Sequence, residues 1–202
     1  NQLKAGDFVP EAYELRFFGG KIDRVDVCET EEQVYVKVMD YKTGSKAFDI
    51  VALYHGLQLQ LMIYMDAAIE FQKKRHPKKE VVPAGVFYYR IQDPIVDKTK
   101  DKEEAEQAVL KQLKPDGIIP LKAEILKHLD LDTTGESMAV PVKYNKNGSV
   151  SGYSKVVAGE HFQAMMVHAR KKMQAARTKI LNGDVGALPY KRVQESGCDY
   201  CP

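Results

Sequence analysis

The chain has 202 residues, 44% of them hydrophobic and 29% charged, which is the composition of one globular domain with a hydrophobic core. No segment approaches the roughly 20 apolar residues of a membrane span, and the first ten residues lack the basic and apolar regions of a signal peptide, so we expect a cytoplasmic protein. The net charge of +2 does not exclude a nucleic acid partner, because a local basic groove can exist in a protein whose total charge is close to zero, and it does not exclude other partners either.

Three strands are predicted at the start of the chain, separated by two glycines and by a polar turn at residues 29–32. They span Glu14–Phe18, Lys21–Val27 and Gln33–Lys42. The third is rich in valine and tyrosine, which favour strands.

Asp49 is predicted to be the N-cap of one long helix that reaches His76. The apolar residues of this segment recur at helical spacing; they are Leu53, Leu57, Leu61, Ala68 and Phe71. Three basic residues and Pro77 follow, as is typical of a helix C-terminus.

Val81–Ile91 predicts another strand. The charged segment Asp97–Lys114 is either a solvated linker or a helix. Beyond it we expect a short helix at Leu121–Leu129, a hairpin around Asn145–Gly148 and a long helix at Gly159–Asn182. The order of these elements predicts a mixed α/β fold around one sheet, followed by an irregular tail.

The third strand ends in two charges on an apolar face. Residues two apart on a strand share a face, so Val36 and Val38 lead into Asp40 and Lys42. If the second and third strands form a simple antiparallel hairpin, Asp23 lies opposite or diagonal to Val38 or Asp40. A slip of one residue would remove this convergence.

Two neighbouring carboxylates repel each other unless a cation lies between them. Mg²⁺ prefers oxygen ligands, which Asp23, Asp40 and the backbone carbonyl of Tyr41 could supply. A bound metal acidifies a water and screens a phosphodiester, and Lys42 could orient that water or offset charge on the phosphate. The alternative is a partly buried ion pair of Asp40 with Lys42 that has a structural role only.

Three motifs together resemble the RecB-type branch of the PD-(D/E)XK nuclease superfamily, and within it the AddB-type nuclease domains of bacterial helicase–nucleases. They are G-x-I-D-R at Gly20–Arg24, D-Y-K-T-G at Asp40–Gly44 and G-L-Q-L-Q-x-x-x-Y at Gly56–Tyr64. The resemblance implies a restriction-endonuclease-like core, with a central mixed sheet flanked by helices. It further implies a DNA exonuclease that uses Mg²⁺ or Mn²⁺ on single-stranded ends, with an AddA-like partner subunit, in double-strand break repair and recombination.

The resemblance also implies a role for each matching residue. Asp23 and Asp40 would be metal ligands, and Lys42 the catalytic lysine. Gln60 and Tyr64 match the Q-x-x-x-Y element, and their spacing puts them on one helix face, where both could point at the site or at the DNA backbone. A polar rim on a core-facing helix is the alternative for this pair.

The C-terminal cysteines match part of a further motif. AddB-type nucleases hold a [4Fe–4S] cluster with four cysteines, and Cys198 and Cys201 correspond to two of them. Since such a cluster needs four thiolates, we expect an excised fragment: a nuclease domain at 1–182 with core motifs at 14–91, and a truncated tail at 183–202 without a bound cluster. Two free thiols, or half of a zinc site shared with a neighbouring molecule, are the alternatives. Cys28 is expected to be a small apolar core residue.

The family usually places a metal-binding histidine upstream of the first motif, and no histidine precedes Asp23. Either that histidine belongs to a missing N-terminal part or Glu14 partly substitutes for it, and we expect weak activity of this segment alone.

Two other functions stay open. One is a stand-alone RecB-like nuclease of the kind used in CRISPR adaptation, and the other is an inactive nuclease fold that serves as a DNA-binding module. The second predicts DNA binding without metal-dependent cleavage. No G-x-x-x-x-G-K-[ST] motif is present, so we expect no ATP-driven motor within this segment.

Overall fold

A six-stranded mixed sheet forms the centre of the molecule, in the order β1-β2-β3-β4-β5-β6. The computed structural model describes residues 8–15, 20–44, 46–91, 94, 101–130, 134–187, 189–192, 195–196 and 198, and for residues 9–15, 20, 192 and 195 it describes the backbone. The strands of the sheet are β1 (Val9–Leu15), β2 (Gly20–Glu29), β3 (Gln33–Lys42), β4 (Glu80–Arg90), β5 (Asp116–Pro120) and β6 (Val156–Val157).

The first three strands form an antiparallel meander, and β4 then lies parallel to β3. Strand β5 is antiparallel to β4, and β6 is parallel to β5. The helices are α1 (Ile50–His55), α2 (Gln60–Arg75), α3 (Lys102–Leu113), α4 (Ala123–Leu129) and α5 (Gly159–Leu181). A separate two-stranded ribbon near the C-terminus pairs β7 (Lys191–Arg192) with β8 (Glu195–Ser196).

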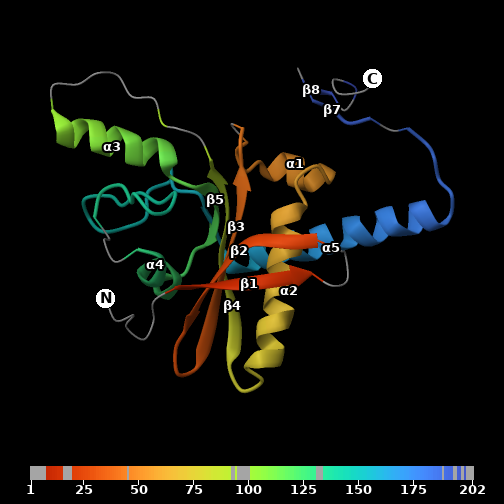
Figure 1. The fold of residues 1–202 in the computed structure, drawn as a ribbon, viewed down its shortest axis with the longest axis horizontal. Helices are drawn as coiled ribbons and strands as arrows, with labels where there is room; N and C mark the ends of the chain where they lie inside the picture. Colours follow the sequence, from red (N-terminus) through yellow and green to blue (C-terminus); the bar gives the residue numbers. More distant parts are fainter. Residues whose placement is uncertain are drawn as a thin grey trace.

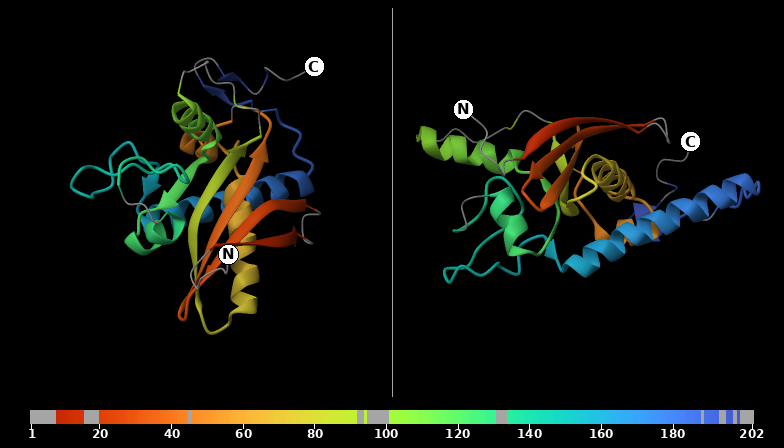
Figure 2. Two further views of the ribbon diagram at one scale, coloured as in Figure 1. Left: turned by 60° about the vertical axis from the view of Figure 1, so that its left-hand side comes forward. Right: turned by 90° about the horizontal axis from the view of Figure 1, so that it is seen from below.

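Helices cover both faces of the sheet, with α2 and α5 on one side and α4 on the other (Figures 1 and 2). Strand β3 therefore contributes to two cores: Val34, Val36 and Val38 pack toward α2, whereas Tyr35 and Met39 pack toward α4. A strand that is buried on both faces is expected where parallel strands meet in the middle of a sheet.

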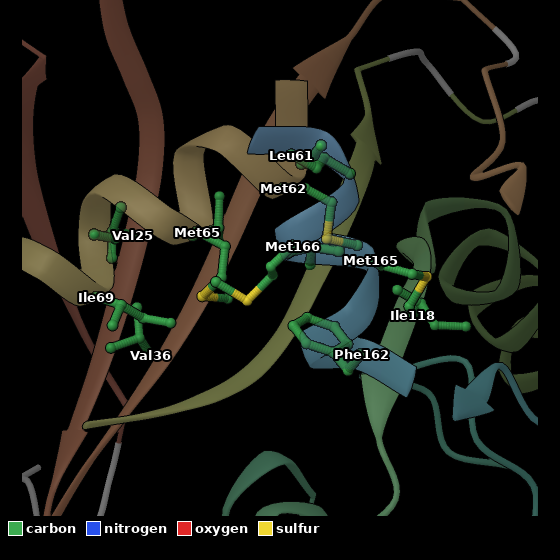
Figure 3. Close-up of a cluster of buried hydrophobic side chains, with 14 of the residues drawn as sticks. Val25, Val36, Leu61, Met62, Met65, Ile69, Ile118, Phe162, Met165 and Met166 are labelled. Carbon is green, nitrogen blue, oxygen red and sulfur yellow. The ribbon is translucent and has the colours of Figure 1, made fainter. Parts of the chain in front are cut away.

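The larger core lies between the sheet, α2 and α5 (Figure 3). Helix α2 contributes aliphatic and sulfur-containing side chains, and α5, which packs against α2, contributes an aromatic ring and two methionines. The labelled members are Val25, Val36, Leu61, Met62, Met65, Ile69, Ile118, Phe162, Met165 and Met166. This packing fixes α2 against β3 and β4.

The prediction of one helix from Asp49 to His76 is wrong, because the chain forms α1 and α2 with a break between them. Asp49 is the N-cap as predicted, and its side chain accepts hydrogen bonds from the backbone of Val51 and Ala52. Gly56 ends α1 in the left-handed conformation, with φ of 90°, which glycine adopts without steric cost. Leu57 is consequently 53% exposed and does not continue the apolar stripe.

The other predicted elements agree with the structure to varying degrees. The strands at Lys21–Val27, Gln33–Lys42 and Val81–Ile91 are confirmed as β2, β3 and β4, and the last long helix is confirmed as α5. The first strand begins earlier than predicted, at Val9, and the charged segment contains a helix, α3. Around Asn145–Gly148 the chain makes a turn with one isolated bridge, between Tyr144 and Val150, instead of a full hairpin.

Strands β5 and β6 were not predicted, because β5 is five residues long and contains glycine and proline, and β6 has two residues. The ribbon of β7 and β8 lies in the tail that was expected to be irregular. Within the described residues, no helix combines the length and the apolar character that a bilayer span requires.

Gly117 is expected to be indispensable for the pairing of β4 with β5. A Cβ atom at this position would overlap the carbonyl oxygen of Val86 and lie 2.9 Å from Cα of Phe87. Because backbone atoms must move to relieve this contact, Gly117→Ala should lower the free energy of unfolding by about 3 kcal/mol, measured by denaturant titration. Gly152→Ala is the control, since a methyl group at that position would meet no other atom within 4 Å; equal stability of the two variants would contradict this account.

Candidate active site

The two acids predicted to share a site are brought together by the register of β2 and β3. Val25 pairs with Val38, and Arg24 pairs with Met39, so the next position of the antiparallel ladder sets Asp23 opposite Asp40. Asp23 also accepts a hydrogen bond from the backbone N–H of Tyr41, with 2.9 Å between nitrogen and Oδ2. The expected hairpin register is therefore confirmed, and both acids lie at the end of the apolar face that packs on α2.

A chain of polar contacts runs from Asp40 to helix α2. The Lys42 ammonium lies 2.5 Å from Oδ2 of Asp40 and donates to Oε1 of Gln60 at 3.1 Å. The amide of Gln60 in turn donates to the Tyr64 hydroxyl at 2.9 Å. Gln60 is the first residue of α2, and Tyr64 lies one turn later on the same face. The Q-x-x-x-Y element thus contacts the lysine, and contact with DNA stays a prediction.

Asp40 is buried, with 2% of its surface exposed. Burial raises the pKa of its carboxyl, the ion pair with Lys42 opposes that shift, and the charge and hydrogen bonding of Asp23 add to it. Oδ2 of Asp40 is buried, and among the described residues the Lys42 ammonium is its ion-pair partner. The negative charge at this position is only partly compensated.

The donor set fits a magnesium-type ion. Among the described residues, no three histidine, cysteine or acidic side chains converge to hold a metal, so the site offers two carboxylates. Mg²⁺ and Mn²⁺ bind readily to one or two carboxylates and complete their shell with water and phosphate oxygens, whereas structural zinc takes four protein ligands. The buried Oδ2 of Asp40 is a carboxylate oxygen paired with the Lys42 ammonium, and it has the chemistry of such a ligand. The role of the Tyr41 carbonyl stays a prediction.

The structural alternative, an ion pair of Asp40 with Lys42, is also present. It does not account for Asp23, because a second carboxylate beside a buried one adds repulsion that a purely structural pair would avoid. The convergence of both acids with the lysine therefore favours a site that takes a cation.

A second ion-pair cluster lies on the opposite face of the same hairpin and was not predicted. Asp26 is 1% exposed and contacts Nε of Arg24 at 2.7 Å and Nζ of Lys37 at 2.8 Å. The hydrogen bond with Asp26 is the largest cause that raises the pKa of Arg24. Because Asp26 and Lys37 are register partners, this cluster stabilises the pairing that aligns the two acids of the site.

Tyr88 is a further neighbour that the sequence did not reveal. It is the register partner of Asp40 on β4 and is buried. The ammonium groups of Lys42 and Lys46 lie 5.8 and 5.5 Å from the centroid of its ring. The sequence predicted only that Tyr88 lies in a strand. Its contact with the site could not be predicted, because no local pattern indicates that β4 lies beside β3.

The remaining residues of interest lie away from this cluster or outside the described residues. Cys28 is buried, as expected, with Sγ 3.6 Å from Nδ1 of His128. Cys198 is exposed, and its backbone N–H donates to Ser196. Cys201 lies outside the described residues. Glu14 pairs with Lys21 in β1 and β2, and its side chain is outside the described part of the structure.

Comparison with known proteins identifies the family. The family model of the PD-(D/E)XK nuclease superfamily matches residues 1–202. Proteins named as a subunit of an ATP-dependent helicase/deoxyribonuclease are similar to this chain: 38% identical in Thermoanaerobacter sp. (strain X514) and 36% in Clostridium tetani (strain Massachusetts / E88), each over 99% of the chain, and 35% in Alkaliphilus metalliredigens (strain QYMF) over 100%. The chain spans 19% of the length of each of these relatives.

Mg²⁺ is expected to stabilise the folded chain through Asp40. A ligand that binds only the folded state raises the free energy of unfolding by about 2.7 kcal/mol at a concentration of 100 times Kd, which thermal melts with increasing MgCl₂ or MnCl₂ would detect. Asp40→Asn should greatly reduce this shift, because Asp23 alone then remains to bind the ion. Asp66→Asn, which changes an acid of α2 that is paired with Arg170, should preserve it. If neither metal changes the melting temperature of the parent chain, the assignment of Asp40 as a metal ligand would be contradicted.

Proposed function

This chain belongs to the PD-(D/E)XK nuclease superfamily, and from that premise we propose that it is the nuclease domain of an AddAB-type helicase–nuclease, which hydrolyses phosphodiester bonds of DNA. One observation carries the proposal: Asp23, Asp40 and Lys42 converge on one end of the sheet, where the Q-x-x-x-Y face of α2 contacts the lysine. The relatives that match 99–100% of the chain are named as deoxyribonuclease subunits, which supports the same substrate.

Each side chain has a role in this reaction. Asp23 and Asp40 would hold Mg²⁺ or Mn²⁺, which when bound acidifies a water and screens the charge of the phosphodiester. Lys42 orients the attacking water or stabilises the negative charge that develops on the phosphate oxygens. Gln60 holds the lysine in place through its side-chain oxygen, and Tyr64 holds Gln60.

The helicase motor and the DNA substrate are proposed from the relatives' names, and the finer points from the resemblance of the three motifs. A helicase motor would deliver single-stranded ends to this domain, so we propose that it works in a complex with an AddA-like subunit, in the cytoplasm, during repair and recombination of double-strand breaks. The nuclease domain would comprise residues 1–182, and the segment 183–202 would lead to an iron–sulfur site. Cys198 and Cys201 are proposed as two of four ligands of a [4Fe–4S] cluster in the full-length protein.

Replacing the lysine is the sharpest test of the reaction. Lys42→Ala should lower the rate of Mg²⁺-dependent digestion of end-labelled single-stranded DNA about 100-fold or more, because a preorganised charge at the reacting phosphate is lost. The Mg²⁺-induced rise in melting temperature should persist, since the acids remain. Lys73→Ala is the matched control, because Lys73 pairs with Glu70 on the exposed face of α2.

Two results would reject the proposal. Equal cleavage by Lys42→Ala and the parent would remove the lysine from the reaction. A parent chain that binds DNA but does not cleave it with Mg²⁺ or Mn²⁺, both alone and within a longer chain that carries all four cysteines, would identify an inactive DNA-binding module instead.

The hydrogen bond of Gln60 with Tyr64 is expected to act on turnover. Tyr64→Phe removes a contact of about 1 kcal/mol that restrains Gln60 and, through it, Lys42. We expect kcat to fall roughly 3- to 10-fold with little change in the melting temperature, measured by single-turnover digestion at saturating enzyme. A larger effect on DNA affinity than on turnover would show that Tyr64 contacts the DNA directly.

A further inference from the structure

The hydroxyl of Tyr88 is a buried polar group that the proposed reaction leaves unused. Tyr88 is 2% exposed, and its hydroxyl has no hydrogen-bond partner among the described residues. Buried polar atoms are nearly always hydrogen-bonded, because desolvation without a partner destabilises the folded state. An unpartnered hydroxyl beside a candidate active site therefore indicates a partner that arrives with the functional state.

The position of Tyr88 in the sheet identifies the group it can reach. Tyr88 on β4 and Asp40 on β3 are direct register partners in a parallel pair, so their side chains leave the sheet on the same face from strands about 4.8 Å apart. Burial first, and the charge of Asp40 second, raise the pKa of Tyr88 to about 12. The hydroxyl thus keeps its proton at neutral pH and can act as a donor toward Asp40.

The two cations beside the ring cannot accept this hydrogen bond. Lys42 and Lys46 hold their ammonium groups over the ring, and an ammonium group has no lone pair to offer. Oδ2 of Asp40, by contrast, is a buried acceptor, and among the described residues its partner is the Lys42 ammonium of the ion pair. A buried hydroxyl without an acceptor and a buried carboxylate paired with the Lys42 ammonium therefore lie on the same face of adjacent strands.

We propose that Tyr88 is a positioning residue of the metal site, and that its hydroxyl donates to the Asp40 carboxylate, directly or through one water, when that carboxylate binds a divalent cation. The inference rests on the proposed function. A cation on the carboxylate repels the Lys42 ammonium that now lies 2.5 Å from Oδ2, and the neutral hydroxyl of Tyr88 can then hold the carboxylate in orientation. Lys42 is then available to the phosphate. Metal-binding carboxylates are commonly held by such outer hydrogen bonds.

The test compares two tyrosine-to-phenylalanine variants in the absence of DNA. Tyr88→Phe should weaken the binding of Mn²⁺, measured by calorimetric titration with MnCl₂, roughly 10- to 100-fold. Its metal-free melting temperature should equal or exceed that of the parent, because the variant removes a buried hydroxyl to which no described residue is hydrogen-bonded. Tyr35→Phe is the matched control. Tyr35 is 3% exposed on the other face of β3, where its hydroxyl donates to Gln33 at 2.5 Å, so its loss should lower the melting temperature without changing Mn²⁺ affinity.

A double-variant cycle separates positioning from packing. In an Asp40→Asn background, Tyr88→Phe should cause no further loss of the remaining Mn²⁺ affinity, because the group it orients is already gone. Additive losses, or Mn²⁺ binding by Tyr88→Phe that matches the parent, would overturn the role of Tyr88 while leaving the proposed nuclease intact. A parent chain that neither binds Mn²⁺ nor cleaves DNA would overturn both.

Discussion

The carboxylates of Asp23 and Asp40 repel each other, and the rest of the site must hold them together against that repulsion. Asp23 and Asp40 face each other because the β2–β3 hairpin has one register, and a slip of one residue would send Asp40 to the other face. That register is specified from both sides of the sheet. Apolar partners such as Val25 and Val38 fix it in the core between the sheet and α2, and the pairing of Asp26 with Lys37 fixes it on the opposite face.

The buried acid costs stability, and the surrounding core offsets that cost. Because the pKa of folded Asp40 is raised above its value in the unfolded chain, ionised Asp40 destabilises the fold at neutral pH, and this penalty disappears as the pH falls below the unfolded value. Burial of one large apolar side chain contributes about 1.5–3 kcal/mol, and Met62 and Met65 of α2 are fully buried. Helix α2 therefore stabilises the sheet with one face and presents Gln60 to the lysine with its first turn.

Local pattern was sufficient for some of this arrangement and insufficient for the rest. The alternation of valines along β3 and the short polar turn predicted the strands. With a simple hairpin assumed, they also predicted that Asp23 lies near Asp40, because the two residues are neighbours along one hairpin. Tyr88 could not be predicted as a neighbour of Asp40, since their pairing depends on which strand β4 joins after the α1–α2 connection. The helix break was missed because Leu57 fits the predicted apolar stripe, whereas the turn is marked by the φ of 90° at Gly56.

That break is part of the site's construction. The polar groups described around Asp40 come from one continuous segment, which comprises β2, β3, α1, α2 and β4. After Lys42 at the end of β3, the chain must cross the face of the sheet and return as β4 beside β3. A single straight helix from Asp49 would place Gln60 about 16 Å along its axis, at 1.5 Å per residue, and away from the strand end where it begins. The turn at Gly56 instead starts a new helix whose first residue contacts Lys42. The turn at Gly56 therefore lets the chain change direction at a place where Gln60 can contact Lys42. Helix α5 holds the new helix against the sheet through Phe162 and Met166.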